Sequence, residues 1–196
     1  MDTQQTGLRK WSHLEVAKLL TSHTAMTELT IEDAMKVVQR MHTRPISKGA
    51  VLVQEGTKGN NYMLLILNGE AVVENESLRK ADALLLGIVG PGNIIGEMGV
   101  FDDEPRSATC RAFTNMDVAV LDRDALADLI AAEPAIGCKL LAALLQRTFA
   151  RLRATNKKLR LSAQVNRALD NEIESLSKPP AAVAPPAPFI GNPLMS

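Results

Sequence analysis

Between Arg44 and Asp122 the chain breaks into short apolar runs that are cut by glycine, proline and asparagine. Short runs of this kind, bounded by turn residues, are typical of β-strands. The strands that we predict cover residues 51–53, 62–67, 70–74, 83–89, 107–112 and 117–121. Several short strands at this spacing predict a small antiparallel β-barrel or double-sheet jelly roll.

Helical patterns lie on both sides of these strands. Residues 11–41 have the apolar spacing of two short helices, and Thr30 is the expected N-cap of the second. A helix start at 122–124 and a proline at position 134 predict one further short helix and then a long helix over 135–176. The predicted fold class is therefore α+β, with N-terminal helices, a small antiparallel barrel and a long C-terminal helix.

Composition narrows the class of protein. A chain of 196 residues can bury one sizeable core, and its length argues against two complete domains. Lys plus Arg equals Asp plus Glu at 22 each, so no overall basic excess points to nucleic acid or to a membrane. We expect Cys110 and Cys138 to be free thiols. The first residues lack a signal-peptide pattern and no apolar run approaches a membrane span, so we expect a cytoplasmic protein.

Glu97 and Arg106 stand nine residues apart around a short apolar turn, within the segment 96–109. A carboxylate and a guanidinium would normally pair with each other. A ligand with hydroxyl groups for the acid and a phosphate for the arginine would satisfy both, and this describes a ribose phosphate. The alternative is a charged turn between two strands, since acidic turns that contain proline are common.

The segment resembles the phosphate-binding cassette of cyclic nucleotide-binding domains, as found in the bacterial catabolite activator protein and in the regulatory subunit of protein kinase A. The family pattern is Gly-Glu, a small apolar helical turn, and then Pro-Arg-Ser/Thr-Ala, and it is complete here with seven residues between Glu97 and Pro105. The resemblance covers about Leu14 to Leu161 and implies an eight-stranded barrel that holds the pocket. Glycines stand where the family reverses its barrel strands: Gly56, Gly69 and Gly92.

The resemblance implies a role for each residue of the cassette. Glu97 would hold the ribose 2′-hydroxyl, and Arg106 would neutralise the cyclic phosphate. The backbone N–H groups of four residues would complete an anion nest, together with the hydroxyl of the serine among them: Gly96, Met98, Ser107 and Ala108. Ser107 is also consistent with cyclic AMP, because members selective for cyclic GMP often have threonine at this place.

A second resemblance concerns the base of the nucleotide. In members that dimerise through the C-terminal helix, an adjacent pair of polar residues caps the purine, and Thr155 and Asn156 stand in that context here. A hydroxyl and an amide could read the exocyclic amine of adenine, which favours cyclic AMP over cyclic GMP. Measured from Pro134, however, the pair lies about one helical turn later than in the catabolite activator.

The long helix carries a regular apolar spacing. An unbroken 4-3 pattern runs through positions 141, 145, 148, 152, 155, 159, 162, 166, 169, 173 and 176. Seven of the eleven are Leu or Ile, which predicts a coiled-coil seam and a homodimer. Four polar residues weaken the seam or set its register: Thr148, Thr155, Ser162 and Asn166. The alternative is a helix that packs on its own barrel.

The same helix holds eight basic residues and no acidic residue between Lys139 and Arg167. This charge could offset the acidic half of the barrel, dock an acidic protein or contact nucleic acid. The absence of interleaved aromatic residues and of a sequence-reading motif argues against direct binding to DNA or RNA. A helix-turn-helix reader would need roughly 60 more structured residues, whereas residues 178–196 are rich in proline and alanine and are expected to be disordered.

We therefore expect four parts: a flexible N-terminus over 1–10, a cyclic nucleotide-binding barrel with flanking helices over 11–134, a dimerisation and lid helix over 135–177, and the tail. No catalytic constellation or metal motif emerges, so we expect a binding protein and not an enzyme. The predicted function is a stand-alone receptor for cyclic AMP, with cyclic GMP less favoured, that signals to an unidentified protein partner. The alternatives are a constitutive dimerisation module with a degenerate pocket, and a DNA-associated regulator that uses the basic helix.

Overall fold

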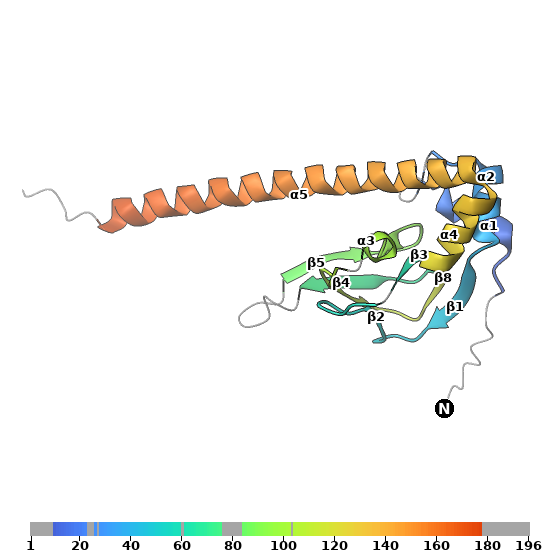
Figure 1. The fold of residues 1–196 in the computed structure, drawn as a ribbon. Helices are drawn as coiled ribbons and strands as arrows, with labels where there is room; N and C mark the ends of the chain where they lie inside the picture. Colours follow the sequence, from blue (N-terminus) through green and yellow to red (C-terminus); the bar gives the residue numbers. More distant parts are fainter. Residues whose placement is uncertain are drawn as a thin grey trace, which may run out of the picture. The chain divides into compact units, whose positions relative to one another are not determined.

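The computed structural model describes residues 10–22, 26, 28–59, 61–75, 84–102 and 104–177 (Figure 1). The chain divides into two compact units, residues 1–150 and 151–196. The first unit contains two β-sheets, the short helices and the start of the last helix. The expected flexible N-terminus, apart from its last residue, and the Pro/Ala tail lie outside the described residues.

Two short helices precede the sheets, as predicted. They are α1 (His13–Leu20) and α2 (Ile31–Val38). Thr30 is the N-cap of α2: its hydroxyl accepts a hydrogen bond from the Asp33 backbone N–H, and the Asp33 carboxylate accepts one from the Thr30 N–H. This reciprocal capping box satisfies two N–H groups that the first turn of a helix leaves unpaired.

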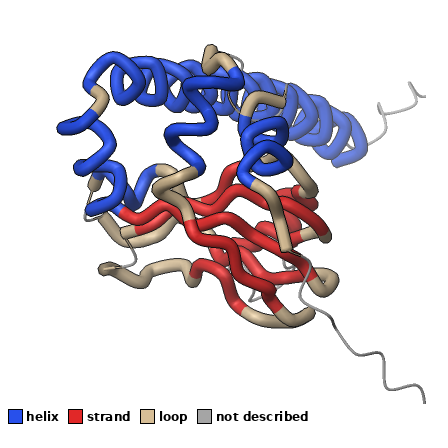
Figure 2. The backbone as a smooth tube through the Cα atoms, turned by 90° about the vertical axis from the view of Figure 1, so that its right-hand side faces the viewer, coloured by secondary structure: helices blue, strands red, loops and turns tan. Residues whose placement is uncertain are grey.

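The described strands form two antiparallel sheets of four strands each, which is the expected jelly-roll arrangement (Figure 2). Their order is β1-β8-β3-β6 in one sheet and β2-β7-β4-β5 in the other. The bounds are β1 (His42–Ile46), β2 (Val51–Val53), β3 (Tyr62–Asn68), β4 (Ala71–Asn75), β5 (Leu84–Val89), β6 (Ile94–Ile95), β7 (Thr109–Ala112) and β8 (Met116–Asp122).

Two of these strands were not predicted from the sequence. The strand β1 is an exposed edge strand that contains Pro45, and proline is tolerated at an edge because no neighbour needs its missing N–H group. The strand β6 has two residues and also lies at an edge. The strand β7 begins at Thr109, two residues later than predicted, because Ser107 and Ala108 form a bend after Arg106.

The strand β3 explains how the core is divided. All its residues from Met63 to Leu67 are buried, and their side chains alternate between two apolar clusters. Leu64 and Ile66 pack between the two sheets. The odd-numbered residues pack against the helices, which lie over one face of the strands (Figure 2). A strand buried on both faces positions the helices against the barrel.

Two helices follow the sheets. The helix α4 (Arg123–Ala132) begins at the N-cap Asp122, whose carboxylate accepts a hydrogen bond of 2.8 Å from the Ala125 N–H. The helix α5 (Pro134–Ser177) has 44 residues and begins with the predicted proline. In the first unit its apolar side chains join the helical core: Ile136, Leu140, Ala143 and Leu144. In the second unit the residues 151–176 are exposed.

Cys110 is buried and Cys138 is exposed, and both are free thiols, as predicted. None of the helices in the described part of the chain has the length and apolar character that crossing a membrane requires.

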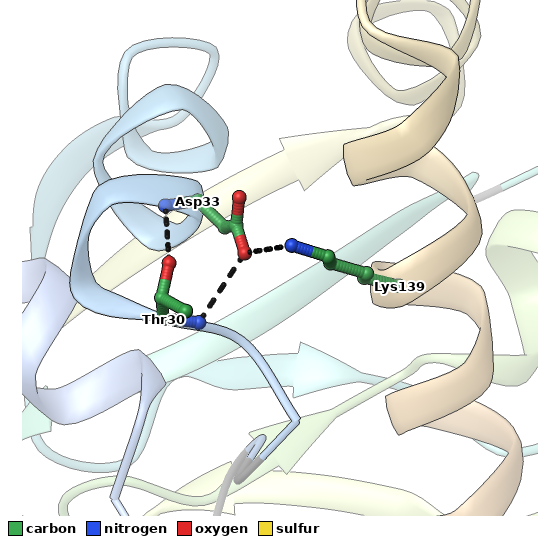
Figure 3. A network of polar contacts seen from close by, with 3 residues as sticks. All are labelled: Thr30, Asp33 and Lys139. Carbon is green, nitrogen blue, oxygen red and sulfur yellow. Dashed lines mark hydrogen bonds and ion pairs between the residues drawn. The ribbon is translucent and has the colours of Figure 1, made fainter.

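An ion pair ties α2 to the start of α5 (Figure 3). The Lys139 ammonium group donates a hydrogen bond of 2.7 Å to the Asp33 carboxylate, which also accepts from the Thr30 N–H at 3.4 Å. The bond from Lys139 holds the pKa of the Asp33 carboxyl group below its ordinary value of 3.8. A lowered pKa means that the pair stabilises the fold above that value and stops doing so as the carboxylate is protonated.

We expect Lys139→Met to raise the pKa of Asp33 toward its ordinary value. Because the pair is partly exposed, the loss in unfolding free energy at pH 7 should be below about 1 kcal/mol. This difference from the wild type should disappear as the pH falls below 3.8. The measurements are an NMR titration of the Asp33 carboxyl carbon and urea unfolding at several pH values.

The matched control is Lys36→Met, which removes the ammonium group that lies 2.8 Å from Glu133. It should leave the titration of Asp33 unchanged. An Asp33 pKa that is the same in Lys139→Met and in the wild type would contradict the assignment.

Candidate functional site

Arg106 lies at the centre of the predicted cassette. Its side chain is almost fully buried, with 8% of the residue exposed. Its guanidinium donates hydrogen bonds to the backbone carbonyl oxygens of Gly96, at 2.8 Å, and Tyr62, at 3.2 Å. The guanidinium carbon also lies 5.8 Å from the centre of the Tyr62 ring. These carbonyl oxygens are neutral, so they orient the guanidinium without cancelling its positive charge. A buried positive charge of this kind favours the binding of an anion.

Two glycines make room for this guanidinium. Gly99 lies in the short helix α3 (Met98–Phe101), and a Cβ atom there would overlap the guanidinium carbon of Arg106. Gly96 has a φ of 80°, and a Cβ atom there would lie 3.1 Å from the Tyr62 carbonyl oxygen. The Gly-Glu start of the cassette and its small apolar turn therefore follow from close packing around Arg106.

Glu97 is the second charged residue of the cassette, and only 5% of it is exposed. It stands at the N-cap position of α3 with helical backbone angles, and its side chain does not cap the helix. The carboxylate is thus not used to satisfy the first turn of α3. The structure brings Gly96, Glu97, Met98 and Arg106 together around α3.

The end of the cassette is joined to the turn after β2. The Arg106 N–H donates to the Thr57 carbonyl oxygen at 3.0 Å, and the Gly56 N–H donates to the Arg106 carbonyl oxygen at 2.9 Å. Gly56 has a φ of 76°, as a turn glycine is expected to have. Ser107 is exposed and Ala108 is partly exposed in the bend that follows. These bonds fix the backbone on both sides of the buried arginine.

A cavity of about 380 Å³ lies between α3 and the first turns of α5. Its lining consists of Glu97, Met98, Phe101, Asp102, Leu141, Leu144, Leu145 and Thr148. The lining is mostly apolar with a few polar groups, as is typical of small-molecule sites. Arg106 is not part of the lining, so the cavity meets the cassette along α3 and at the residues on either side of it, Glu97 and Asp102.

Arg123 is a cassette contact that sequence reasoning missed. Its guanidinium donates to the carbonyl oxygens of Val100, at 2.8 Å, Asp102, at 2.9 Å, and Gly99, at 3.3 Å. These bonds satisfy carbonyl groups at the C-terminal end of α3, which is too short to satisfy them itself. One signal was present in the sequence: a cation in the first turn of α4 opposes the helix dipole and therefore needs another reason to be there.

The two residues expected to cap a purine belong to the second unit. Thr155 and Asn156 are exposed residues of α5 in the second unit. Their assignment to a ligand stays a prediction. Thr148, expected from the sequence only as a polar seam residue, lines the cavity beside α3, and its hydroxyl donates a hydrogen bond of 3.0 Å to the Leu144 carbonyl oxygen.

The comparison with protein families agrees with this geometry. The family model described as the cyclic nucleotide-binding domain matches residues 43–133. The CRP-like cAMP-activated global transcriptional regulator of Mycobacterium tuberculosis is 32% identical over 112 residues, which are 57% of this chain and 47% of that protein. The cAMP-dependent protein kinase regulatory subunit of Candida albicans is 31% identical over 117 residues, which are 60% of this chain and 22% of that protein. The chain thus spans less than half the length of these relatives.

Solved structures give the same result. The crystal structure of a cyclic nucleotide-binding domain from Methylobacillus flagellatus KT has a TM-score of 0.66 and 33% identity, and the match covers 76% of this chain and 83% of that chain. The catabolite activator protein of Thermus thermophilus has a TM-score of 0.59 and 26% identity, with 74% of this chain and 63% of that chain covered.

Proposed function

The chain belongs to the cyclic nucleotide-binding domain family, and from this premise we propose that it is a cyclic AMP receptor that signals through α5. The observation that carries the proposal is the buried guanidinium of Arg106 beside the Gly96–Glu97 turn. The planar fork of an arginine suits the oxygens of a cyclic phosphate. The Glu97 carboxylate accepts from the ribose 2′-hydroxyl, and the N–H groups of Met98, Ser107 and Ala108 face the phosphate.

The choice of cyclic AMP over cyclic GMP has two supports. Ser107 stands where receptors selective for cyclic GMP often have threonine, and both curated relatives reported above are named for cyclic AMP. Thr155 and Asn156 then read the adenine amine, and one of them reaches in from a partner chain, as is often the case in family members that dimerise through this helix.

The signal passes from α3 to α5 across the cavity that both helices line. Met98 and Phe101 are half-exposed apolar side chains on the α3 side of the cavity. Leu145, which is also half-exposed, lines the cavity from α5. Capture of the phosphate by Arg106 pulls in the cassette turn around Met98 and Phe101, and α5 closes over the base. The ligand shifts this equilibrium because it binds the closed state more tightly than the open one.

The experiment that tests the proposal is a calorimetric titration of the full chain with cyclic AMP and, separately, cyclic GMP. We expect cyclic AMP to bind with a low-micromolar or lower Kd and cyclic GMP to bind more weakly. The noncyclic 5′-AMP is the control, because it keeps the base and ribose but changes the charge and shape of the phosphate. Absence of heat with both cyclic nucleotides would leave a structural dimerisation module in place of a receptor.

We further propose that the chain is a homodimer through the seam of α5. In the second unit the seam presents exposed apolar residues at helical spacing: Leu152, Leu159, Leu169, Ile173 and Leu176. A row of leucine and isoleucine at alternating spacings of four and three is the pattern that two helices bury against each other. Asn166 lies within the row, where a pair of asparagines, one from each helix, favours a parallel two-helix dimer in register.

Leu159→Asp is expected to convert the dimer to a monomer in sedimentation-velocity experiments. The substitution puts a carboxylate into the middle of the apolar seam, where it would be desolvated without a partner. The control is Leu161→Asp, the same change two residues later and off the seam; both leucines are exposed in the single chain, at 67% and 53%. A dimer that survives Leu159→Asp, or dissociates equally with Leu161→Asp, would contradict the seam.

A further inference from the structure

The basic stretch of α5 separates into two groups once its contacts are known. Lys139 pairs with Asp33, and Arg147 donates to the Asn93 side chain and the Ile94 carbonyl oxygen, both at 3.4 Å. These two residues belong to the packing of the first unit. The other six lie in the second unit and are exposed: Arg151, Arg153, Lys157, Lys158, Arg160 and Arg167.

Four of these six share one face of the helix. Arg153, Lys157, Arg160 and Arg167 follow one another at spacings of four, three and seven residues, so they lie within roughly 80° of the helix circumference at 3.6 residues per turn. We call this set the basic face. It extends for about 21 Å along the axis at 1.5 Å per residue. The apolar seam lies on the opposite side of α5, so a dimer formed through the seam leaves the basic face exposed.

The charge of the chain is divided along its length. Residues 151–196 contain seven basic and three acidic residues, a net charge of +4, and residues 1–150 contain fifteen basic and nineteen acidic residues, a net charge of −4. The three acids of the second unit all follow Arg167. A neutral chain therefore presents a segment with a strongly positive local potential.

We propose that the basic face of α5 binds the phosphate backbone of double-stranded nucleic acid without reading its sequence. Three of its four residues are arginines, whose forked donors match phosphate oxygens. Its length corresponds to about twelve phosphate charges of a duplex at 1.7 Å per charge. Contacts of this kind position a protein on a duplex and carry no sequence information, so the missing reading motif is expected.

The chemistry of the face also distinguishes a duplex from other anionic partners. Residues 151–177 contain no aromatic side chain on which the bases of a single strand could stack. The only other residue on the face between Arg153 and Arg167 is Gln164, so the face is entirely polar. Protein interfaces bury an apolar or aromatic centre, which this face lacks, whereas nucleic-acid interfaces are polar and positively charged.

The test is fluorescence anisotropy of a labelled 20-base-pair duplex of arbitrary sequence, titrated with the full chain at 50–200 mM salt. Contact with four phosphates predicts a slope of about −3.6 for log K against log salt, which is a weakening of roughly 150-fold over this range. The triple variant Arg153→Gln, Arg160→Gln, Arg167→Gln keeps one of the four contacts, so its slope should be shallower, at about −0.9. Glutamine has a helix propensity close to that of arginine, so the variant should keep its helix, and circular dichroism measures whether the helical content is unchanged.

The matched control removes three exposed basic side chains from the first unit: Lys18→Gln, Arg44→Gln and Lys58→Gln. It should keep the slope of the wild type. The proposal is overturned if the wild type fails to bind at 50 mM salt, or if the two triple variants change the slope equally. It is also overturned if poly-glutamate binds more tightly than the duplex and loses binding in the α5 variant, since the partner would then be an acidic protein.

Discussion

Replacing Arg106 with alanine is expected to weaken cyclic AMP binding by about 100-fold or more. A hydrogen bond from a charged group contributes about 1.5–3 kcal/mol, and a phosphate held by two such bonds loses both. At about 1.4 kcal/mol for each factor of ten, the loss exceeds two orders of magnitude. Arg106→Lys should lose most of the same affinity, because an ammonium group cannot reproduce the planar fork. Calorimetry with cyclic AMP measures both variants.

The control for this prediction is Arg111→Ala, which removes a guanidinium five residues later. Arg111 donates a hydrogen bond of 3.0 Å to the Gly49 carbonyl oxygen, away from the cassette. Its loss should leave the affinity unchanged within about twofold. Because Arg106 also bonds to Gly96 and Tyr62, thermal unfolding of both variants must accompany the titrations. A folded Arg106→Ala protein that binds cyclic AMP like the wild type would refute the assignment of the phosphate site.

Gly99→Ala is the second change with a large expected effect, although it adds only one methyl group. The new Cβ would overlap the guanidinium carbon of Arg106 and lie 2.6 Å from Nη2, so the guanidinium must move. We expect about a tenfold or greater loss of cyclic AMP affinity. The folded state should also lose roughly 1–3 kcal/mol, as is usual for an overpacked site. Calorimetry and urea unfolding measure the two effects.

Gly90→Ala is the matched control, since it adds the same methyl group where the nearest atom, the Gly69 carbonyl oxygen, lies 4.0 Å away. This variant should bind and unfold like the wild type. If Gly99→Ala bound cyclic AMP with unchanged affinity, the position of the guanidinium in this structure would not be the one that matters for binding.

The sequence predicted the fold through features that are local. Turn glycines, apolar runs and capping residues act over a few residues, and the helices and all six strands that they predicted are present. The missed strand β1 is exposed and has no such local signal, and β6 has only two residues, so both are recognised through their pairing with β8 and β3. Edge strands of this kind are defined by their neighbours and not by their own side chains.

The same distinction applies to the candidate site. Glu97 and Arg106 could be predicted as site residues because both belong to one continuous motif. Arg123 and Thr148 were missed because they come from α4 and α5 and meet α3 only after folding. The fit of Gly99 against the guanidinium is likewise a packing distance, which no spacing in the sequence contains.

The contact between Arg123 and α3 limits how far this cassette can be moved between proteins. A loop of residues 96–109 grafted onto another barrel would leave behind the guanidinium that satisfies three of its carbonyl oxygens. It would also lose the Tyr62 carbonyl oxygen that orients Arg106. It would lose the backbone bonds to Gly56 and Thr57 as well. The smallest portable unit therefore extends from the turn after β2 through the first turn of α4, and the motif alone does not make the site.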